Sequence, residues 1–179
     1  MDGASGSAPP AAPAEDGAPA ADPGQAADGY SDEPKPLAEY AATTLVFNAL
    51  MAAALAAGRD RLPERVGVGD VVLMGVASHK LSRLVAKDRV TSFLRVPFVR
   101  YESEGGPGEV SESPRGTGVR RTLGELLVCP YCLGQWVTAG YATGLLFAPR
   151  ATRFVGSIFA GLTVSDFLQV AYKAGQERI

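Results

Sequence analysis

The sequence predicts an all-α integral membrane protein, a helical bundle preceded by a disordered N-terminal tail. Two observations support this fold class: long stretches of the later chain hold no charged residue, and the first 36 residues hold little that could form a core. A third observation, the uneven spacing of Lys and Arg, assigns the connecting segments to the two sides of a membrane.

The predicted tail, residues 1–36, is rich in small residues and acids. Of its 36 positions, 25 are Ala, Pro, Gly or Ser, seven are acidic, and Lys35 is the one base. Such a segment has too little apolar surface to offset the entropy lost on ordering, so we expect it to be solvated and disordered. Residues 37–179 hold 16 bases and 12 acids, a net charge of +4, and form the predicted membrane domain. They contain no long run of Lys and Arg, so a nucleic-acid partner is not indicated.

Four segments of the domain are predicted to cross the bilayer, whose hydrocarbon core takes roughly 20 residues of helix. Tyr40–Gly58 is uncharged over 19 residues, and Leu126–Pro149 over 24. Another candidate contains the acid Asp166, and one more begins near Asp70 and ends in a basic run. The predicted spans are about 40–58, 66–86, 123–149 and 154–172.

Residues 66–86 decide between four spans and three. Three spans would place 14 Lys and Arg residues inside and three outside, whereas four spans place ten inside and five outside. The positive-inside rule prefers three. Val71–Ser78 is nevertheless too apolar to lie in water, so we expect four spans, with three as the alternative. Either count leaves loop 87–121 and the C-terminus on the cytoplasmic side of the plasma membrane.

The loop begins with a segment, Val90–Tyr101, in which aromatic and aliphatic residues alternate with Arg95 and Arg100. This mixture is typical of chains that lie at a membrane interface, with guanidinium groups on lipid phosphates. We therefore expect the bilayer and its anionic headgroups as partners. A capping box from Thr122 to Glu125 is predicted to open the span that follows.

Most polar residues of the predicted spans converge near the cytoplasmic side. Asp166 is expected to pair with Lys80 or Arg83, because an unpaired charge inside a membrane is costly. Two pairs of small residues, Gly140-x-x-x-Gly144 and Ser157-x-x-x-Gly161, offer faces for close packing of helices within one chain or in a homo-oligomer.

Both cysteines of the chain stand in one C-x-x-C motif, Cys129-Pro-Tyr-Cys132. Pro130 lacks a backbone N–H, so the helix should kink or restart there, leaving Cys129 at an N-cap-like position that stabilises a thiolate. Three interpretations stay open: small buried residues that only pack, a redox dithiol, and half of a zinc site. Zinc would need two more ligands, either His79 and Asp166 or the cysteines of a second chain. No other cofactor is indicated.

Three stretches resemble a known family: ASHKLSRLVAKDRVTSFLRVPFVRYE, PRGTGVRRTLGELLVCPYCLGQWV and SDFLQVAY. They are similar to a bacterial family of small membrane proteins known as domain of unknown function 1360, some of whose members are linked to sporulation. The resemblance covers about Val66–Tyr172. It implies a multi-pass membrane protein and no established activity, substrate or cofactor. The sequence as a whole favours a non-enzymatic interaction or scaffold role, with a membrane thiol-redox or zinc-binding protein as the alternative.

Overall fold

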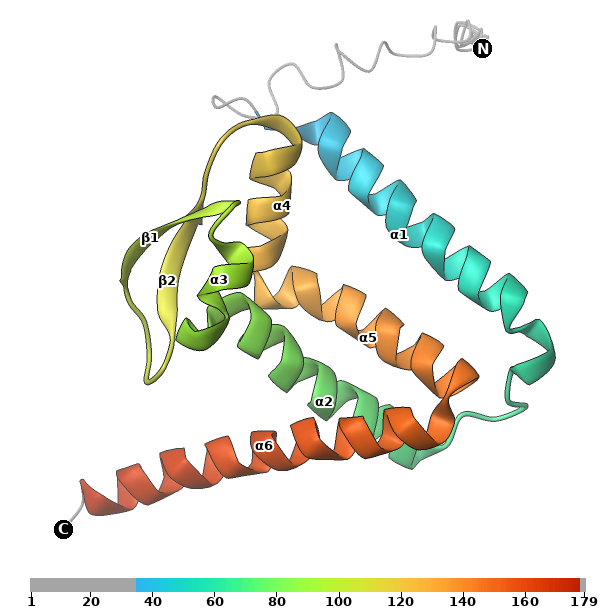
Figure 1. The fold of residues 1–179 in the computed structure, drawn as a ribbon. Helices are drawn as coiled ribbons and strands as arrows, with labels where there is room; N and C mark the ends of the chain where they lie inside the picture. Colours follow the sequence, from blue (N-terminus) through green and yellow to red (C-terminus); the bar gives the residue numbers. More distant parts are fainter. Residues whose placement is uncertain (1–34, 178–179) are drawn as a thin grey trace, which may run out of the picture. The chain divides into compact units, whose positions relative to one another are not determined.

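The computed structural model describes residues 35–177, so the predicted tail, residues 1–36, lies almost wholly outside the described residues. Within that range the chain forms helices and one β-hairpin (Figure 1). The elements are α1 Leu37–Ala57, α2 Val68–Lys87, α3 Ser92–Arg95, β1 Val99–Glu104, β2 Val110–Pro114, α4 Gly118–Val128, α5 Pro130–Phe147 and α6 Pro149–Gln176, with 3-10 turns η2 Arg59–Arg61 and η3 Arg89–Thr91.

Two of these helices, α1 and α6, are long and apolar enough to cross a membrane. α1 has 21 residues, none of them buried, and α6 has 28, of which Gly156 and Thr163 are buried. The other two long helices, α2 and α5, do not meet the same test. α2 contains several charged residues. α5 is short, and its Gly, Thr, Tyr and Gln residues lower its mean hydropathy. The prediction of four spans is therefore supported for two helices.

α5 and α6 pack against α2 through small side chains. The buried residues of α2 are Ala77, Ser78, Ser82 and Ala86. On α6, a Cβ atom at Gly156 would lie 3.3 Å from Leu73 Cγ, and the Thr163 hydroxyl donates to the Val76 carbonyl oxygen at 3.3 Å. Large apolar residues of α2 such as Val72 remain exposed. Small residues inside and large ones outside are the pattern of helices packed within a membrane.

The two predicted small faces are used only in part. A Cβ atom at Gly144 would lie 2.6 Å from Thr152 Oγ1, so α5 and α6 approach closely at this point. A Cβ atom added at Gly140 or at Gly161 would meet no atom of a neighbouring helix within 4 Å. The glycine of α6 that does meet α2 is Gly156, which the spacing of small residues did not single out.

The predicted cytoplasmic loop folds into a compact segment, which we call the hairpin unit: residues 88–117 together with α4. β1 pairs antiparallel with β2, with Val99 opposite Pro114, and β2 lies against α4 (Figure 1). Val99 and Val110 are buried. At Gly124 a Cβ atom would come within 2.6 Å of the Phe98 carbonyl oxygen, so this position requires glycine. The sequence did not predict the hairpin.

The predicted capping box at the start of α4 is wrong. The helix begins at Gly118, with Thr117 as N-cap, because the chain turns into it through glycines with positive φ at 116 and 118. Thr122 therefore lies inside the helix, where its hydroxyl donates to the Gly118 carbonyl oxygen. Glu125 accepts hydrogen bonds from Arg121 at 3.1 Å and from the Tyr40 hydroxyl of α1.

Candidate functional site: the cysteine pair

The cysteine pair lies where α4 ends and α5 begins. α4 ends at Val128, Pro130 is the first residue of α5, and Cys129 between them is extended, with φ −100° and ψ 102°. Proline suits the first helical position because its missing N–H would have no helical partner there. The predicted break at Pro130 and the N-cap position of Cys129 are both confirmed.

The two thiols are close to each other. Cys129 Sγ accepts a hydrogen bond from the Cys132 backbone N–H at 3.2 Å and lies 2.7 Å from Cys132 Sγ. A disulfide bond is about 2.05 Å long, so both cysteines are free. Cys132 is exposed, and so is its neighbour Tyr131. The pair can therefore be reached from outside the protein.

The surroundings of Cys129 favour a thiolate. Burial alone would raise the pKa of its thiol, but three hydrogen bonds and the positive charge of Lys87 outweigh burial and lower the pKa below its ordinary value of 9.0. The hydrogen bonds come from Cys132 Sγ and from the backbone N–H groups of Cys132 and Tyr131. A lowered pKa increases the thiolate fraction at neutral pH, and the thiolate is the nucleophile.

The residues considered as zinc ligands are not assembled within one chain. Among residues 35–177, no three His, Cys, Asp or Glu side chains lie close enough to hold a metal ion. His79 is exposed, and Asp166 is engaged by Lys80. A site that pools Cys129 and Cys132 from two chains stays a prediction.

Ion pairs tie α2 to α6 at two levels. Lys80 Nζ lies 2.7 Å from Asp166 Oδ2, with the lysine side chain 18% exposed and the aspartate 48%. Nearer the start of both helices, Arg153 donates to both carboxylate oxygens of Asp70 at 2.8 Å. Arg83, the other candidate partner of Asp166, instead binds Glu109 in the turn before β2.

Arg95 does not lie at a lipid interface, contrary to the sequence prediction. Its side chain is completely buried, and it pairs with Glu112 of β2. It also donates to the carbonyl oxygens of Val85 and Asp88 and to the hydroxyl groups of Thr91 and Ser92. A buried guanidinium is stable only when paired and hydrogen-bonded in this way, so it is unavailable to lipid phosphate.

The rest of the predicted interfacial segment remains exposed. Arg100 lies on β1 and is exposed, so its contact with lipid headgroups stays a prediction. Four large apolar side chains around α3 are exposed as well: Val90, Phe93, Leu94 and Val96. We call these four residues the α3 patch.

The chain is similar to proteins known from bacteria. Residues 73–172 match the family model described as "Protein of unknown function (DUF1360)". Over 119 residues, 65% of this chain and 88% of the relative, it is 28% identical to "UPF0713 protein YngL" of Bacillus subtilis (strain 168). Over 88 residues, 48% of this chain and 75% of the relative, it is 38% identical to "Sporulation protein YjcA" of the same organism. No solved structure matches the chain. Because the family model spans more than half of the sequence, the chain belongs to the DUF1360 family of proteins of unknown function.

Proposed function

We propose that the chain is a multi-pass protein of the bacterial plasma membrane that performs thiol–disulfide exchange at the α4–α5 junction, on the cytoplasmic side. One observation favours this chemistry over simple packing: Cys129 is the N-cap of α5, with its Sγ hydrogen-bonded to the Cys132 N–H and 2.7 Å from the second thiol. A buried pair that only packs would need neither the N-cap position nor the exposure of Cys132.

The membrane placement has separate support. α1 and α6 carry exposed apolar surface along lengths sufficient to span a bilayer, and α2 places small residues inside and large ones outside. We therefore propose α2 and α5 as two further spans, which gives four. Loop 87–121 and the C-terminus then lie in the cytoplasm, as the excess of Lys and Arg requires.

The proposed exchange uses the two thiols in turn. The Cys129 thiolate attacks one sulfur of a disulfide in the substrate, forming a mixed disulfide while the other sulfur leaves as a thiolate. Cys132 then loses its proton and attacks Cys129 Sγ, forming the intrachain disulfide and releasing the second substrate sulfur as a thiol. A cytoplasmic pair rests in the reduced state, so the substrate is reduced and the pair is oxidised.

The test uses full-length protein in mild detergent, with 5,5′-dithiobis(2-nitrobenzoate) as the disulfide substrate. Wild type should release two thionitrobenzoates per chain and retain none, because Cys132 displaces the first from Cys129. C132S should release one and retain one, whereas C129S should react slowly. If wild type retains the probe, or both thiols react slowly and independently, the exchange proposal is wrong.

A second candidate is the non-enzymatic interaction or scaffold role. The α3 patch favours it, because four large apolar side chains face outward on a segment that also carries Arg100. A bilayer surface with anionic headgroups suits that chemistry. One relative is named a sporulation protein, and an interaction role in that process is a proposal for this chain. Slow thiols without metal would support this role, and stoichiometric zinc in the purified protein would support a site shared between two chains.

A further inference from the structure

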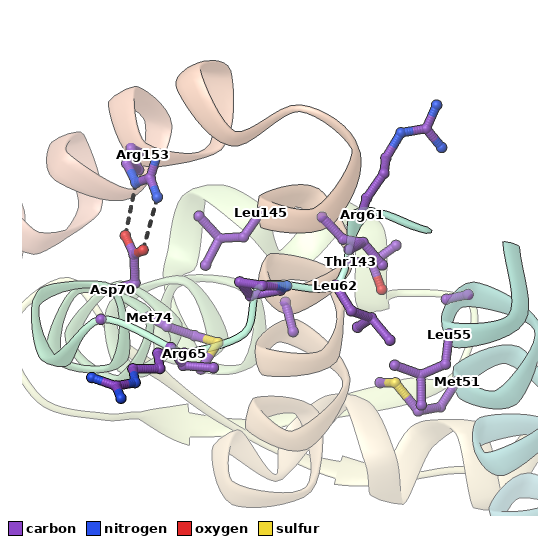
Figure 2. Close-up of a pocket in the computed structure, with 16 residues that line it drawn as sticks. Met51, Leu55, Arg61, Leu62, Arg65, Asp70, Met74, Thr143, Leu145 and Arg153 are labelled. Carbon is purple, nitrogen blue, oxygen red and sulfur yellow. Dashed lines mark hydrogen bonds and ion pairs between the residues drawn. The ribbon is translucent and has the colours of Figure 1, made fainter. Parts of the chain in front are cut away.

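A cavity of about 340 Å³ lies far from the cysteines, between the end of α1, the start of α2, the end of α5 and the loop that joins α1 to α2. Figure 2 shows apolar side chains from each of these elements at its wall, among them Met51, Leu55, Leu62, Met74 and Leu145. Its volume falls in the range of about 300–1,000 Å³ that is typical of small-molecule sites, and apolar walls with few polar groups are typical of them too.

The charges around this cavity are unbalanced. Its lining holds three guanidinium groups and one carboxylate, a net charge of +2. Asp70 is engaged by Arg153 through two hydrogen bonds (Figure 2). Arg61 and Arg65 are exposed, and within residues 35–177 neither meets a carboxylate. The Arg61 guanidinium instead lies 5.5 Å from the centroid of the Phe147 ring.

We infer that this cavity binds an anionic amphiphile, with an acyl chain against the apolar wall and an acidic head group at its rim. Arg61 and Arg65 stand on different sides of that rim (Figure 2), and each offers a guanidinium to the head group. Within the described residues, the one carboxylate of the lining, Asp70, is engaged by Arg153 and makes no ion pair with either of these arginines. A guanidinium binds phosphate or carboxylate through charge-assisted hydrogen bonds. A zwitterionic amphiphile of the same length would contact the apolar wall equally well, but its head group would bind the arginines less strongly. The site is separate from the thiol chemistry.

Native mass spectrometry of the full-length protein in neutral detergent can test the site. The probes are phosphatidylglycerol, phosphatidylcholine with the same acyl chains, and oleate. We expect one phosphatidylglycerol per chain, bound about tenfold more tightly than phosphatidylcholine. Competition by oleate at similar concentration would identify the carboxylate of a free fatty acid as an equal ligand. Its failure to compete would identify the phosphate headgroup as the ligand.

Matched variants separate the cavity from general lipid adhesion. Ala54→Phe places a ring in the cavity and should weaken binding about tenfold or more, whereas Ala53→Phe on the same helix, outside the lining, should not. R61Q/R65Q should remove the preference for the acidic lipid, and R59Q, whose arginine pairs with Asp60, should keep it. Equal binding of both phospholipids by wild type, or equal binding by A54F and A53F, would overturn the inference. The thermal midpoint of each variant in the same detergent verifies its fold.

Discussion

The hairpin unit and the helical part of this chain bury opposite kinds of residue. In the hairpin unit the largest completely buried side chain is that of Arg95, paired with Glu112, and Val99 and Val110 are inside. In the α2–α6 contact the buried residues are small, and Val, Leu and Phe side chains face outward. The proposed membrane placement accounts for this difference: a unit in water buries residues such as Val99 and Val110, whereas helices in lipid pack through small residues and turn large apolar ones outward. The α3 patch is the part of the hairpin unit that leaves large apolar side chains exposed.

The largest effect is expected from Arg95→Ala, which leaves Glu112 buried without its partner. Removing one partner of a buried ion pair costs about 3–5 kcal/mol, so the hairpin unit should open locally. Limited proteolysis of native membranes, followed by mapping of the cleavage sites, measures this opening. Arg100→Ala is the matched control, since Arg100 is exposed on β1. Cleavage of R95A within the hairpin at the wild-type rate would contradict a water-facing folded unit.

Two ion pairs join α2 to α6, and the loss of Lys80–Asp166 should lower the stability of the helical part more than the loss of Asp70–Arg153. Lys80→Met leaves the Asp166 carboxylate unpaired. An unpaired charge costs about 2.5–3.5 kcal/mol at the centre of a membrane helix, which is the upper bound for Asp166 near the cytoplasmic end. Asp166 is half-exposed to the surroundings of the helices, which are lipid if the proposed spans are right. We expect a clear drop in the thermal midpoint of protein in lipid nanodiscs.

Asp70→Asn is the control for this experiment. It breaks the more exposed pair with Arg153, where water or headgroups can replace the lost partner, so its effect should be smaller. Equal midpoints for K80M and D70N would mean that both pairs lie in water, and the proposed position of α2 would be wrong.

A smaller effect is expected where α2 and α6 touch. Gly156→Leu forces a side chain against Leu73, and overpacking of this kind costs about 1–3 kcal/mol. Gly161→Leu, on the same helix, enters open space and should leave the midpoint unchanged within one chain. If G161L also lowers stability, or shifts the oligomeric state on size exclusion, a second copy covers that face, as the predicted small-residue pattern allows.

The sequence predicted those features that depend only on residues close together in the chain. An uncharged run of 19 residues suffices to predict α1, and the missing N–H of Pro130 suffices to place Cys129 at a helix start. The Lys80–Asp166 contact also lies where charge in an apolar segment suggested, although its position within a membrane stays a prediction.

The errors concern contacts between distant residues. Nothing local reveals that Arg95 pairs with Glu112, 17 residues later, and an arginine among aromatic residues is equally typical of an interface. The hairpin could not be predicted because its sequence is polar and rich in Glu, Ser and Gly. Few of its positions show the alternation in hydropathy that indicates a strand. Gly156 was missed because its contact depends on the register of α6 against α2, which spacing within one helix does not determine.

The smallest expected effect is a shift in pKa at Cys129, at the border between the two regions. α4 belongs to the hairpin unit and α5 to the helical part. The pKa of the Cys129 thiol between them therefore depends on whether water or lipid reaches the junction. Cys132→Ser keeps a hydroxyl that can donate to Cys129 Sγ, and Cys132→Ala removes it. Both variants leave Cys129 as the single thiol, so its alkylation by iodoacetamide can be followed against pH.

Because the hydrogen bond from residue 132 stabilises the thiolate, the alkylation rate should level off at a lower pH in C132S, which keeps a side-chain donor to Cys129 Sγ, than in C132A, which has none. A negatively charged alkylating reagent then gives the depth of the junction. Reaction with both the charged and the neutral reagent would place Cys129 in water beside the hairpin unit. Reaction with the neutral reagent alone would mean that lipid reaches past Pro130 and that the border lies within α4.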